Sequence, residues 1–193
     1  MKTDLWLLPL QADSADYAEA EALYVDAFPP EERRNVKDWK NLMAHDGGAF
    51  RALRIAGPER GFLGFLTYWD LGKFYYVEHF AVSASARGGG IGGKALDLLL
   101  ATTKDMPLVL EVEPPVTDDA RRRIAFYERH RLMLSPLPYW QPPYDPTETK
   151  GLELNLMTTD LDFLNTHADE VRQTLYREIY HATFQDSADN GNK

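Results

Sequence analysis

A glycine-rich loop lies near the middle of the chain, within the stretch AVSASARGGGIGGKAL (residues 81–96). Five of the six positions from Gly88 to Gly93 are glycine, Arg87 precedes them, and an apolar, helix-like run follows. Without Cβ atoms, the main-chain N–H groups at such a helix start can approach an anion closely. Arg87 can add a fork of hydrogen-bond donors, and Lys94 a point charge. The loop therefore predicts a phosphate site, and its residues are Arg87, Gly88, Gly89, Gly90, Ile91, Gly92, Gly93 and Lys94.

The loop fits two familiar nucleotide-binding patterns incompletely. The triphosphate pattern G-x-x-x-x-G-K-[ST] fails at Ala95, where a hydroxyl must hold Mg²⁺. The dinucleotide pattern G-x-G-x-x-G is met by Gly88, Gly90 and Gly93. However, residues 83–87 separate it from the preceding strand, and no further βαβ units follow. A nicotinamide dinucleotide-binding domain therefore remains one alternative. A third pattern, R-x-x-G-x-G, is met by Arg87, Gly90 and Gly92.

Three glutamates on two predicted strands are candidates for a general base. Glu78 precedes the glycine loop, and Glu111 and Glu113 lie on the next strand along the chain. Any of these carboxylates could deprotonate an ammonium group through a water molecule. Side chains two apart on a strand share a face. We therefore expect Glu111 and Glu113 on one face, Glu78 on a face with Tyr76, and His79 on the face opposite Glu78.

The composition limits the classes of function. The 193 residues suit one domain, and the absence of cysteine excludes thiolate zinc sites and a cysteine nucleophile. The net charge of −9 argues against nucleic-acid binding and mildly favours a cationic partner. No apolar run is long enough to span a bilayer, and the first residues do not read as a secretory signal. We therefore expect a cytoplasmic protein with no nucleic acid, membrane or metal partner.

The elements that must position these residues alternate in type along the chain. Apolar periodicity and turn signals predict the order β-α-α-β-β-β-loop-α-β-α-β-β. Runs of neighbouring strands with a single βαβ crossover favour a mixed α/β sheet over a doubly wound one. The predicted strands are 5–11, 50–56, 61–70, 73–82, 107–113 and 151–159, and the predicted helices are 16–28, 31–44, 93–105 and 117–133. Residues 134–146 are proline-broken and predicted to be irregular.

The C-terminal part of the chain carries a helical pattern of its own. Apolar residues recur at three- or four-residue spacing from Leu164 to Ala182, which predicts an amphipathic helix. We expect this helix, within 160–184, to pack on its own domain or, as the alternative, on a partner in a homodimer. The predicted organisation is therefore one main domain over 1–159, the helix over 160–184 and a disordered tail over 185–193.

Three segments together resemble the GCN5-related N-acetyltransferase (GNAT) superfamily. They are HFAVSASARGGGIGGKAL (79–96), LVLEVE (108–113) and RRRIAFYERHRLM (121–133). The resemblance implies an α/β (α+β) fold with a mixed, mostly antiparallel, splayed sheet flanked by helices. It also implies acetyl-CoA as co-substrate, with its pyrophosphate on the glycine loop and its acetyl group beside Ala81 and Val82. The sequence departs from the family where Arg131 and Leu132 replace the usual glycine and aromatic residue, which predicts a different exit from that helix.

The resemblance also implies roles in catalysis. Tyr127 matches the family tyrosine that protonates or hydrogen-bonds the departing CoA sulfur, and the Val82 N–H would polarise the acetyl carbonyl. Glu111 occupies a position that serves as base in some relatives, so it ranks with Glu78. AFPPEERR (27–34) resembles the turn that shapes the acceptor site. The expected acceptor-binding residues are Phe28, Glu32, Tyr76, Glu113 and Tyr139.

We therefore predict an N-acetyltransferase that acts on a primary amine, with a small cationic molecule as the expected acceptor. Attack would be direct, with a carboxylate base acting through water and Tyr127 as acid. Besides the nicotinamide-binding domain, a non-catalytic acyl-CoA sensor on the same fold is the alternative.

Overall fold

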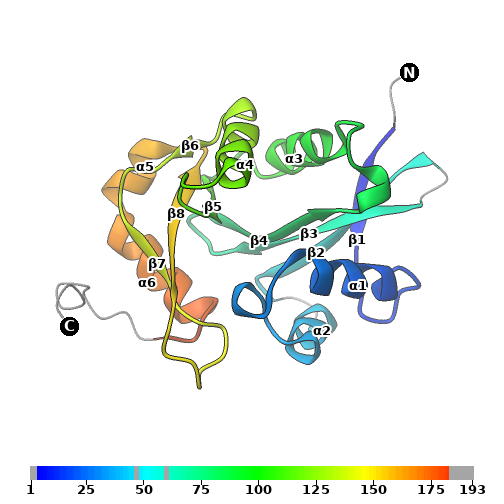
Figure 1. Cartoon of the computed structure of the whole chain (residues 1–193), viewed down its shortest axis with the longest axis horizontal. Coiled ribbons are helices and arrows are strands. Elements are labelled where there is room, and N and C mark those ends of the chain that lie inside the picture. Colours follow the sequence, from blue (N-terminus) through cyan, green and yellow to red (C-terminus); the bar gives the residue numbers. More distant parts are fainter. Residues whose placement is uncertain (1–3, 46–47, 59–60, 183–193) are drawn as a thin grey trace.

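An open β-sheet runs through the molecule between layers of helices (Figure 1). The computed structural model describes residues 4–45, 48–58 and 61–182. In this part of the chain the strand order is β1-β2-β3-β4-β5-β8-β6, and β7 also pairs with β8. The strands are β1 (Trp6–Pro9), β2 (Phe50–Ala56), β3 (Phe62–Asp70), β4 (Tyr75–Val82), β5 (Leu108–Val112), β6 (Met133–Leu134), β7 (Tyr139–Gln141) and β8 (Leu152–Thr158).

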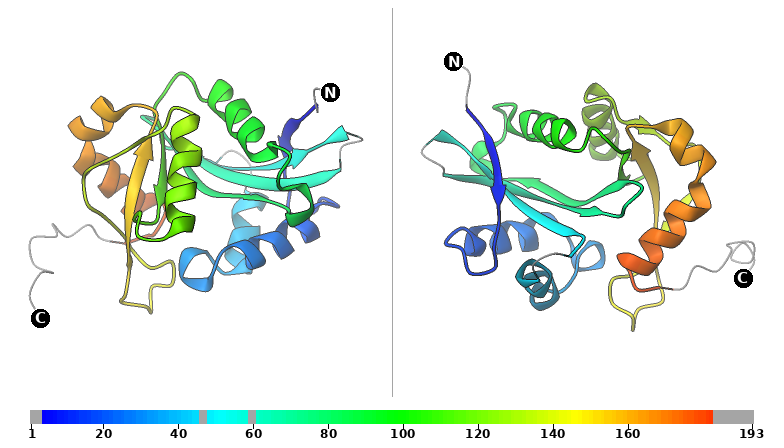
Figure 2. Two further views of the ribbon diagram at one scale, coloured as in Figure 1. Left: turned by 45° about the horizontal axis from the view of Figure 1, so that its top comes forward. Right: turned by 180° about the vertical axis from the view of Figure 1, so that it is seen from behind.

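Helices cover both faces of this sheet (Figure 2). α1 and α2 lie on one face, α3 and α4 lie on the other, and α5 and α6 pack beside β8. Each face has its own apolar core, with Tyr24 and Phe65 on the α1 side and Leu96 and Ile124 on the α3 side. The helices are α1 (Tyr17–Ala27), α2 (Val36–Ala44), α3 (Ile91–Thr102), α4 (Asp118–Arg129), α5 (Leu161–Thr166) and α6 (Ala168–Glu178), with 3-10 turns η1 (Pro30–Glu32) and η3 (Ala84–Ala86).

The sheet splays open between β4 and β5, the one parallel pair among the described strands. Their pairing runs only from Tyr75 opposite Leu108 to Val77 opposite Leu110. Beyond that point β4 continues to Val82 without a partner on this side. This arrangement confirms the predicted mixed, mostly antiparallel, splayed fold and excludes a doubly wound sheet.

A β-bulge in β4 marks the point where the strands part. Thr67 of β3 pairs with His79 and the next residue, Tyr68, pairs with Val77, so Glu78 is the extra residue. A bulge bends its strand and increases the local twist. The opening between β4 and β5 thus begins at Glu78, one of the three candidate bases predicted from the sequence.

The bulge also breaks the alternation of side chains along β4. Glu78 and His79 both contact Tyr144, the former through a hydrogen bond and the latter through ring stacking at 6.2 Å. Both therefore lie on the α1 face with Tyr76, while Phe80 packs into the α3 core. The prediction that His79 points away from Glu78 is wrong, because the extra residue turns two successive side chains to one face.

The C-terminal helical region is two helices, α5 and α6, that meet at His167, where the sequence predicts one. Val171, Leu175 and Ile179 are fully buried in the same core as Tyr24. The region therefore packs on its own chain. The tail predicted to be disordered, 185–193, lies outside the described residues.

Within residues 4–45, 48–58 and 61–182, no helix has both the length and the apolar character needed to cross a membrane. The same ranges contain no group of three or more His, Asp or Glu side chains that could hold a metal ion.

Candidate active site

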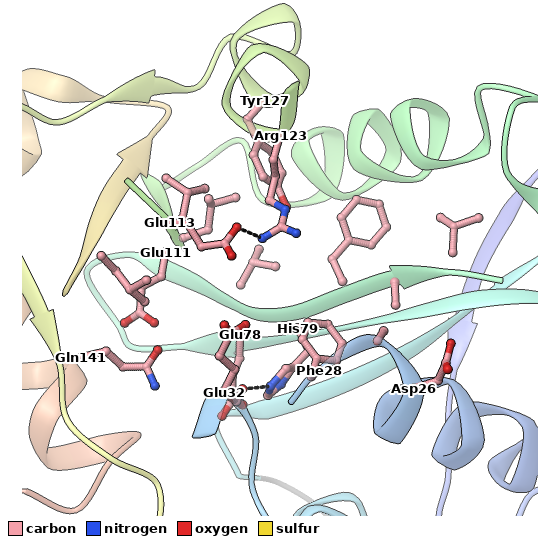
Figure 3. A pocket seen from close by; sticks show the side chains of 18 of the residues that line it. Asp26, Phe28, Glu32, Glu78, His79, Glu111, Glu113, Arg123, Tyr127 and Gln141 are labelled. Carbon is pink, nitrogen blue, oxygen red and sulfur yellow. Dashed lines mark hydrogen bonds and ion pairs between the residues drawn. The ribbon is translucent and has the colours of Figure 1, made fainter. Parts of the chain in front are cut away.

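A cavity of about 460 Å³ occupies the opening between β4 and β5 (Figure 3). Its walls come from the end of α1, from η1, from both splayed strands, from α4 and from the β7–β8 region. The polar side chains that line it are Asp26, Glu32, Glu78, His79, Arg87, Glu111, Glu113, Arg123, Tyr127, Gln141 and Tyr144. All three candidate bases therefore meet at this one opening, but their surroundings differ.

Glu111 presents a largely buried carboxylate to the cavity. Its Oε1 accepts a hydrogen bond from the Tyr139 hydroxyl at 2.5 Å, and the Tyr180 hydroxyl lies 2.9 and 2.8 Å from Oε1 and Oε2. Burial raises the pKa of Glu111 to about 7, although these hydroxyls and that of Tyr76 oppose the rise. A carboxylate with this pKa can both accept and release a proton near neutral pH.

Glu78 is instead enclosed by donors, and its side chain has no exposed surface. Arg34 Nε donates to Oε1 at 3.1 Å, Tyr144 donates to the same oxygen at 3.0 Å, and Trp69 Nε1 donates to Oε2 at 2.7 Å. Burial alone would raise the pKa of Glu78, but Arg34 and the other partners bring it below its usual range. Such a carboxylate is a weak base, and its contacts indicate a structural role.

Glu113 lies just past the end of β5, and its carboxylate pairs with Arg123 of α4 at 2.6 Å. Figure 3 shows it directed toward α4, whereas Glu111 points toward the opposite side of the cavity. The prediction that these two side chains share a face is therefore wrong, because the strand ends between them. Across the cavity, burial and the charge of Glu113 raise the pKa of Glu32, and Arg123 counteracts this.

Tyr127 reaches the cavity from α4, as the sequence predicts. Its ring belongs to the core on the α3 side of the sheet. Burial raises the pKa of Tyr127 to about 12, despite the opposing effect of Arg123. The phenol is therefore protonated at neutral pH and available as a hydrogen-bond donor.

The helix α4 ends as if the family glycine were still present. Arg131 adopts a left-handed backbone conformation, with φ of 69°, and its N–H bonds to the Glu128 carbonyl. The N–H of Leu132 returns to the Tyr127 carbonyl at 3.2 Å, and Leu132 is buried. The predicted change of exit is wrong, because Arg131 takes up the conformation that glycine would adopt at lower cost.

The glycine loop leads directly into α3. Gly90 is the N-cap with φ of 71°, no side chain caps the helix, and Gly88 has φ of 84°. The first helical bond is from Lys94 N to the Gly90 carbonyl, so the preceding N–H groups point out of the helix start. A Cβ at Gly88 or Gly90 would meet no atom within 4 Å, so the surroundings of these two residues are open on the Cβ side.

Gly93 is predicted to bind phosphate with the rest of the loop, but in the structure its missing side chain makes room for His130. A Cβ built there would lie 2.9 Å from Nε2 of His130, whose Nδ1 contacts Asp97 at 2.6 Å. The missing side chain thus lets the imidazole of α4 pack against the start of α3. At Gly92 a Cβ would make only ordinary contacts, so packing does not require glycine there.

The end of β4 presents main-chain groups to the opening. Ser83 N bonds to Leu63 of β3, and because successive N–H groups point to opposite strand edges, that of Val82 faces away from β3. The Val82 carbonyl on the same edge accepts a bond from Arg87 Nε at 3.1 Å. Arg87, Ala81 and Val82 line the cavity, and they connect it to the exposed glycines.

The residues expected to bind the acceptor divide into two groups. Phe28, Glu32 and Glu113 line the cavity, and the Phe28 ring packs on His79 at 4.6 Å. Tyr76 and Tyr139 do not belong to its lining, because they are buried behind Glu111. The structure brings to the site several residues that the sequence reasoning missed, namely Asp26, Arg34, Arg123, Gln141, Tyr144 and Tyr180.

Known proteins share this architecture. A solved structure described as "Putative acetyltransferase from GNAT family from Bacteroides thetaiotaomicron" matches with a TM-score of 0.84 and 37% identity, over 92% of this chain and 99% of that chain. "Putative acetyltransferase YjbC" of Bacillus subtilis (strain 168) is 26% identical over 176 residues, 81% of this chain and 84% of that protein. The spermidine N-acetyltransferase from Vibrio cholerae, in complex with CoA and spermine, has the same fold at a TM-score of 0.61 and 12% identity, over 80% of this chain and 94% of that chain.

These matches define the class of protein, which is an acetyltransferase. The model of the Acetyltransferase (GNAT) family matches residues 15–131, more than half of the chain. The chain belongs to this family, and the resemblance inferred from its glycine loop and flanking segments is confirmed.

Proposed function

We propose that this enzyme transfers the acetyl group of acetyl-CoA to a primary amine of a small cationic molecule, with Glu111 as base and Tyr127 as hydrogen-bond donor. The observation that carries the proposal is the meeting of these two side chains in one cavity, at the point where the strands part. One of them has a pKa near neutrality and the other stays protonated.

The loop before α3 fits the cofactor's diphosphate. Its N–H groups at the helix start are uncapped, and a Cβ at Gly88 or Gly90 would meet no atom within 4 Å. A helix N-terminus carries partial positive charge, which gives an acidic protein a local means of binding an anion. Arg87 lies between this loop and the cavity and can add a further contact. Acetyl-CoA supplies an acetyl group activated as a thioester.

Glu111, Val82 and Tyr127 have separate parts in the proposed transfer. Glu111, directly or through water, accepts the proton that the acceptor ammonium must lose before its nitrogen bonds to the acetyl carbon. The Val82 N–H faces the opening and is suited to polarise the acetyl carbonyl. Tyr127 hydrogen-bonds the sulfur as the carbon–sulfur bond breaks. Its pKa of about 12 exceeds the usual thiol value of about 8.5, so Tyr127 keeps its proton. The nitrogen loses its second proton as the amide forms, and this proton passes through water to the departing thiolate.

The balance of charge favours a cationic acceptor. Asp26, Glu32, Glu111 and Glu113 line the cavity, and Arg123 and Arg87 are the cations that line it. Since Arg123 is already paired with Glu113, the acceptor side keeps an excess of carboxylates. This supports a small amine in its ammonium form as the molecule that enters.

A panel of amines assayed with acetyl-CoA and free-thiol detection tests the proposal. Glu111→Gln should lower kcat/KM by about 100-fold or more, as expected for loss of a general base. Glu113→Gln is the matched comparison on the same strand end, and its effect should fall mainly on KM. Tyr127→Phe should reduce turnover while calorimetry still detects CoA binding.

Three results would contradict the proposal. If the Glu111→Gln variant works at the wild-type rate, Glu111 is not the base. A Tyr127→Phe enzyme that keeps its full function would favour an acyl-CoA sensor. If NADH raises the melting temperature and acetyl-CoA does not, acetyl-CoA is not the co-substrate of this protein.

A further inference from the structure

The Glu111 carboxylate is held by hydroxyl groups that come from outside the matched family region. Tyr139 lies on β7 and Tyr180 lies just after α6, both beyond residue 131, where the family match ends. An ionised carboxylate only accepts hydrogen bonds, so both tyrosines donate to Glu111. The Tyr76 hydroxyl lies 3.1 Å from that of Tyr180 and, since the Tyr180 proton is directed at Glu111, Tyr76 donates in turn.

The segment that carries Tyr180 is fixed by a charged anchor. Arg34 Nη2 donates to the Ile179 carbonyl at 2.6 Å, while its Nε donates to Glu78. The Tyr180 ring also packs against Tyr144 at 4.9 Å, and Tyr180 is 5% exposed. Glu78 therefore holds Arg34, and Arg34 holds the main chain next to the residue that contacts the base.

We propose that Tyr180 is a positioning residue of the acetyl-transfer reaction, which fixes the Glu111 carboxylate and makes the segment after α6 part of the active site. The proposal rests on Glu111 acting as the base. One Tyr180 hydroxyl within 3 Å of both carboxylate oxygens restricts rotation of that group. Hydrogen bonds to the charged form also favour its ionisation, against the burial that disfavours it.

The ionisable groups around Glu111 are tyrosines and one further glutamate. The tyrosines around it have pKa values raised by burial and by the Glu111 charge, so they stay protonated through neutral pH. Glu78 adds a like charge, but its own pKa is lowered and it does not titrate near 7. The groups are Tyr76 and Glu78 from β4, Tyr139 from β7, Tyr144 from the following loop, and Tyr176 and Tyr180 from the C-terminal region.

The test is Tyr180→Phe, which keeps the buried ring and removes only the hydroxyl. Loss of this donor should raise the pKa of Glu111, and the acidic limb of kcat/KM should move up by about one pH unit. At pH 7 this lowers kcat/KM about fivefold, since the ionised fraction falls from about one half to about one tenth. Tyr139→Phe removes the other donor and should move the limb in the same direction.

Tyr68→Phe is the matched control, because it removes a part-buried tyrosine hydroxyl from the core on the other face of the sheet. It should leave the pH profile unchanged with the same amine. Carbon-13 NMR of the glutamate carboxyls gives a second readout without turnover, since Glu111→Gln identifies the resonance by its loss. That resonance should titrate at higher pH in folded Tyr180→Phe.

The possible outcomes separate the two proposals. If Tyr180→Phe shifts neither the acidic limb nor the carboxyl resonance, the positioning role of Tyr180 is overturned. In that case an inactive Glu111→Gln variant would still support Glu111 as the base. A fully active Glu111→Gln would overturn the proposed function itself.

Discussion

The burial of Glu111 should be measurable as a pH-dependent loss of stability. Its pKa rises from the ordinary 4.5 to about 7 in the folded protein. The folded state therefore binds more protons than the unfolded state between these values, and the free energy of unfolding falls as pH rises through this window. At about 1.36 kcal/mol per pKa unit, the full shift corresponds to about 3 kcal/mol.

Glu111→Gln removes this titration and keeps the shape of the side chain. Between pH 5 and pH 8, the wild-type protein should lose about 2.5 kcal/mol more than the variant, because part of the 3 kcal/mol is already lost at pH 5. Urea denaturation of both proteins at the two pH values gives the difference, with equal m-values as the check on two-state unfolding. If the two proteins change in parallel, the carboxylate is not destabilised by burial and the reasoning from its environment is wrong.

Three further substitutions test the framework around the site. Arg34→Ala should destabilise the fold by about 3–5 kcal/mol in chemical denaturation, because it leaves the buried Glu78 carboxylate without its cation. Arg131→Gly should stabilise it by about 1 kcal/mol, since φ is 69° there, and an unchanged or lower melting temperature would contradict this. Gly64→Ala should cost about 2–4 kcal/mol in a thermal melt, since a Cβ would lie 2.3 Å from the Ala81 carbonyl oxygen; a melt like that of the wild type would show that β4 can move aside.

The glycine loop and Tyr127 could be predicted because their signals are local. A glycine-rich helix start and a tyrosine within a helical pattern can both be recognised without knowing where the helix lies in the fold. Glu78 and Glu111 could not be ranked this way, since both are glutamates on predicted strands next to the opening. The bulge at Glu78 and the donors around it depend on pairing with β3 and on distant segments, which alternation along β4 cannot indicate.

Tyr144 and Tyr180 were missed for a related reason. Tyr144 lies in the proline-broken stretch 134–146, whose irregular backbone gives no periodicity that would show where its aromatic side chains point. Tyr180 follows Ile179 at the end of an apolar stripe, and such a stripe indicates packing alone. Only the tertiary fold, which places the loop between β7 and β8 and the segment after α6 beside β4 and β5, brings the two hydroxyls to buried carboxylates.

The tie between Arg34 and Ile179 has a practical consequence for handling this enzyme. A purification tag at the carboxyl terminus would join the chain on the side of Tyr180, the residue that we propose holds the base. A tag at the other terminus would join the chain ahead of β1, at the edge of the sheet opposite the β8 and β6 end (Figure 1). Kinetic work is therefore best done with an amino-terminal tag or with none.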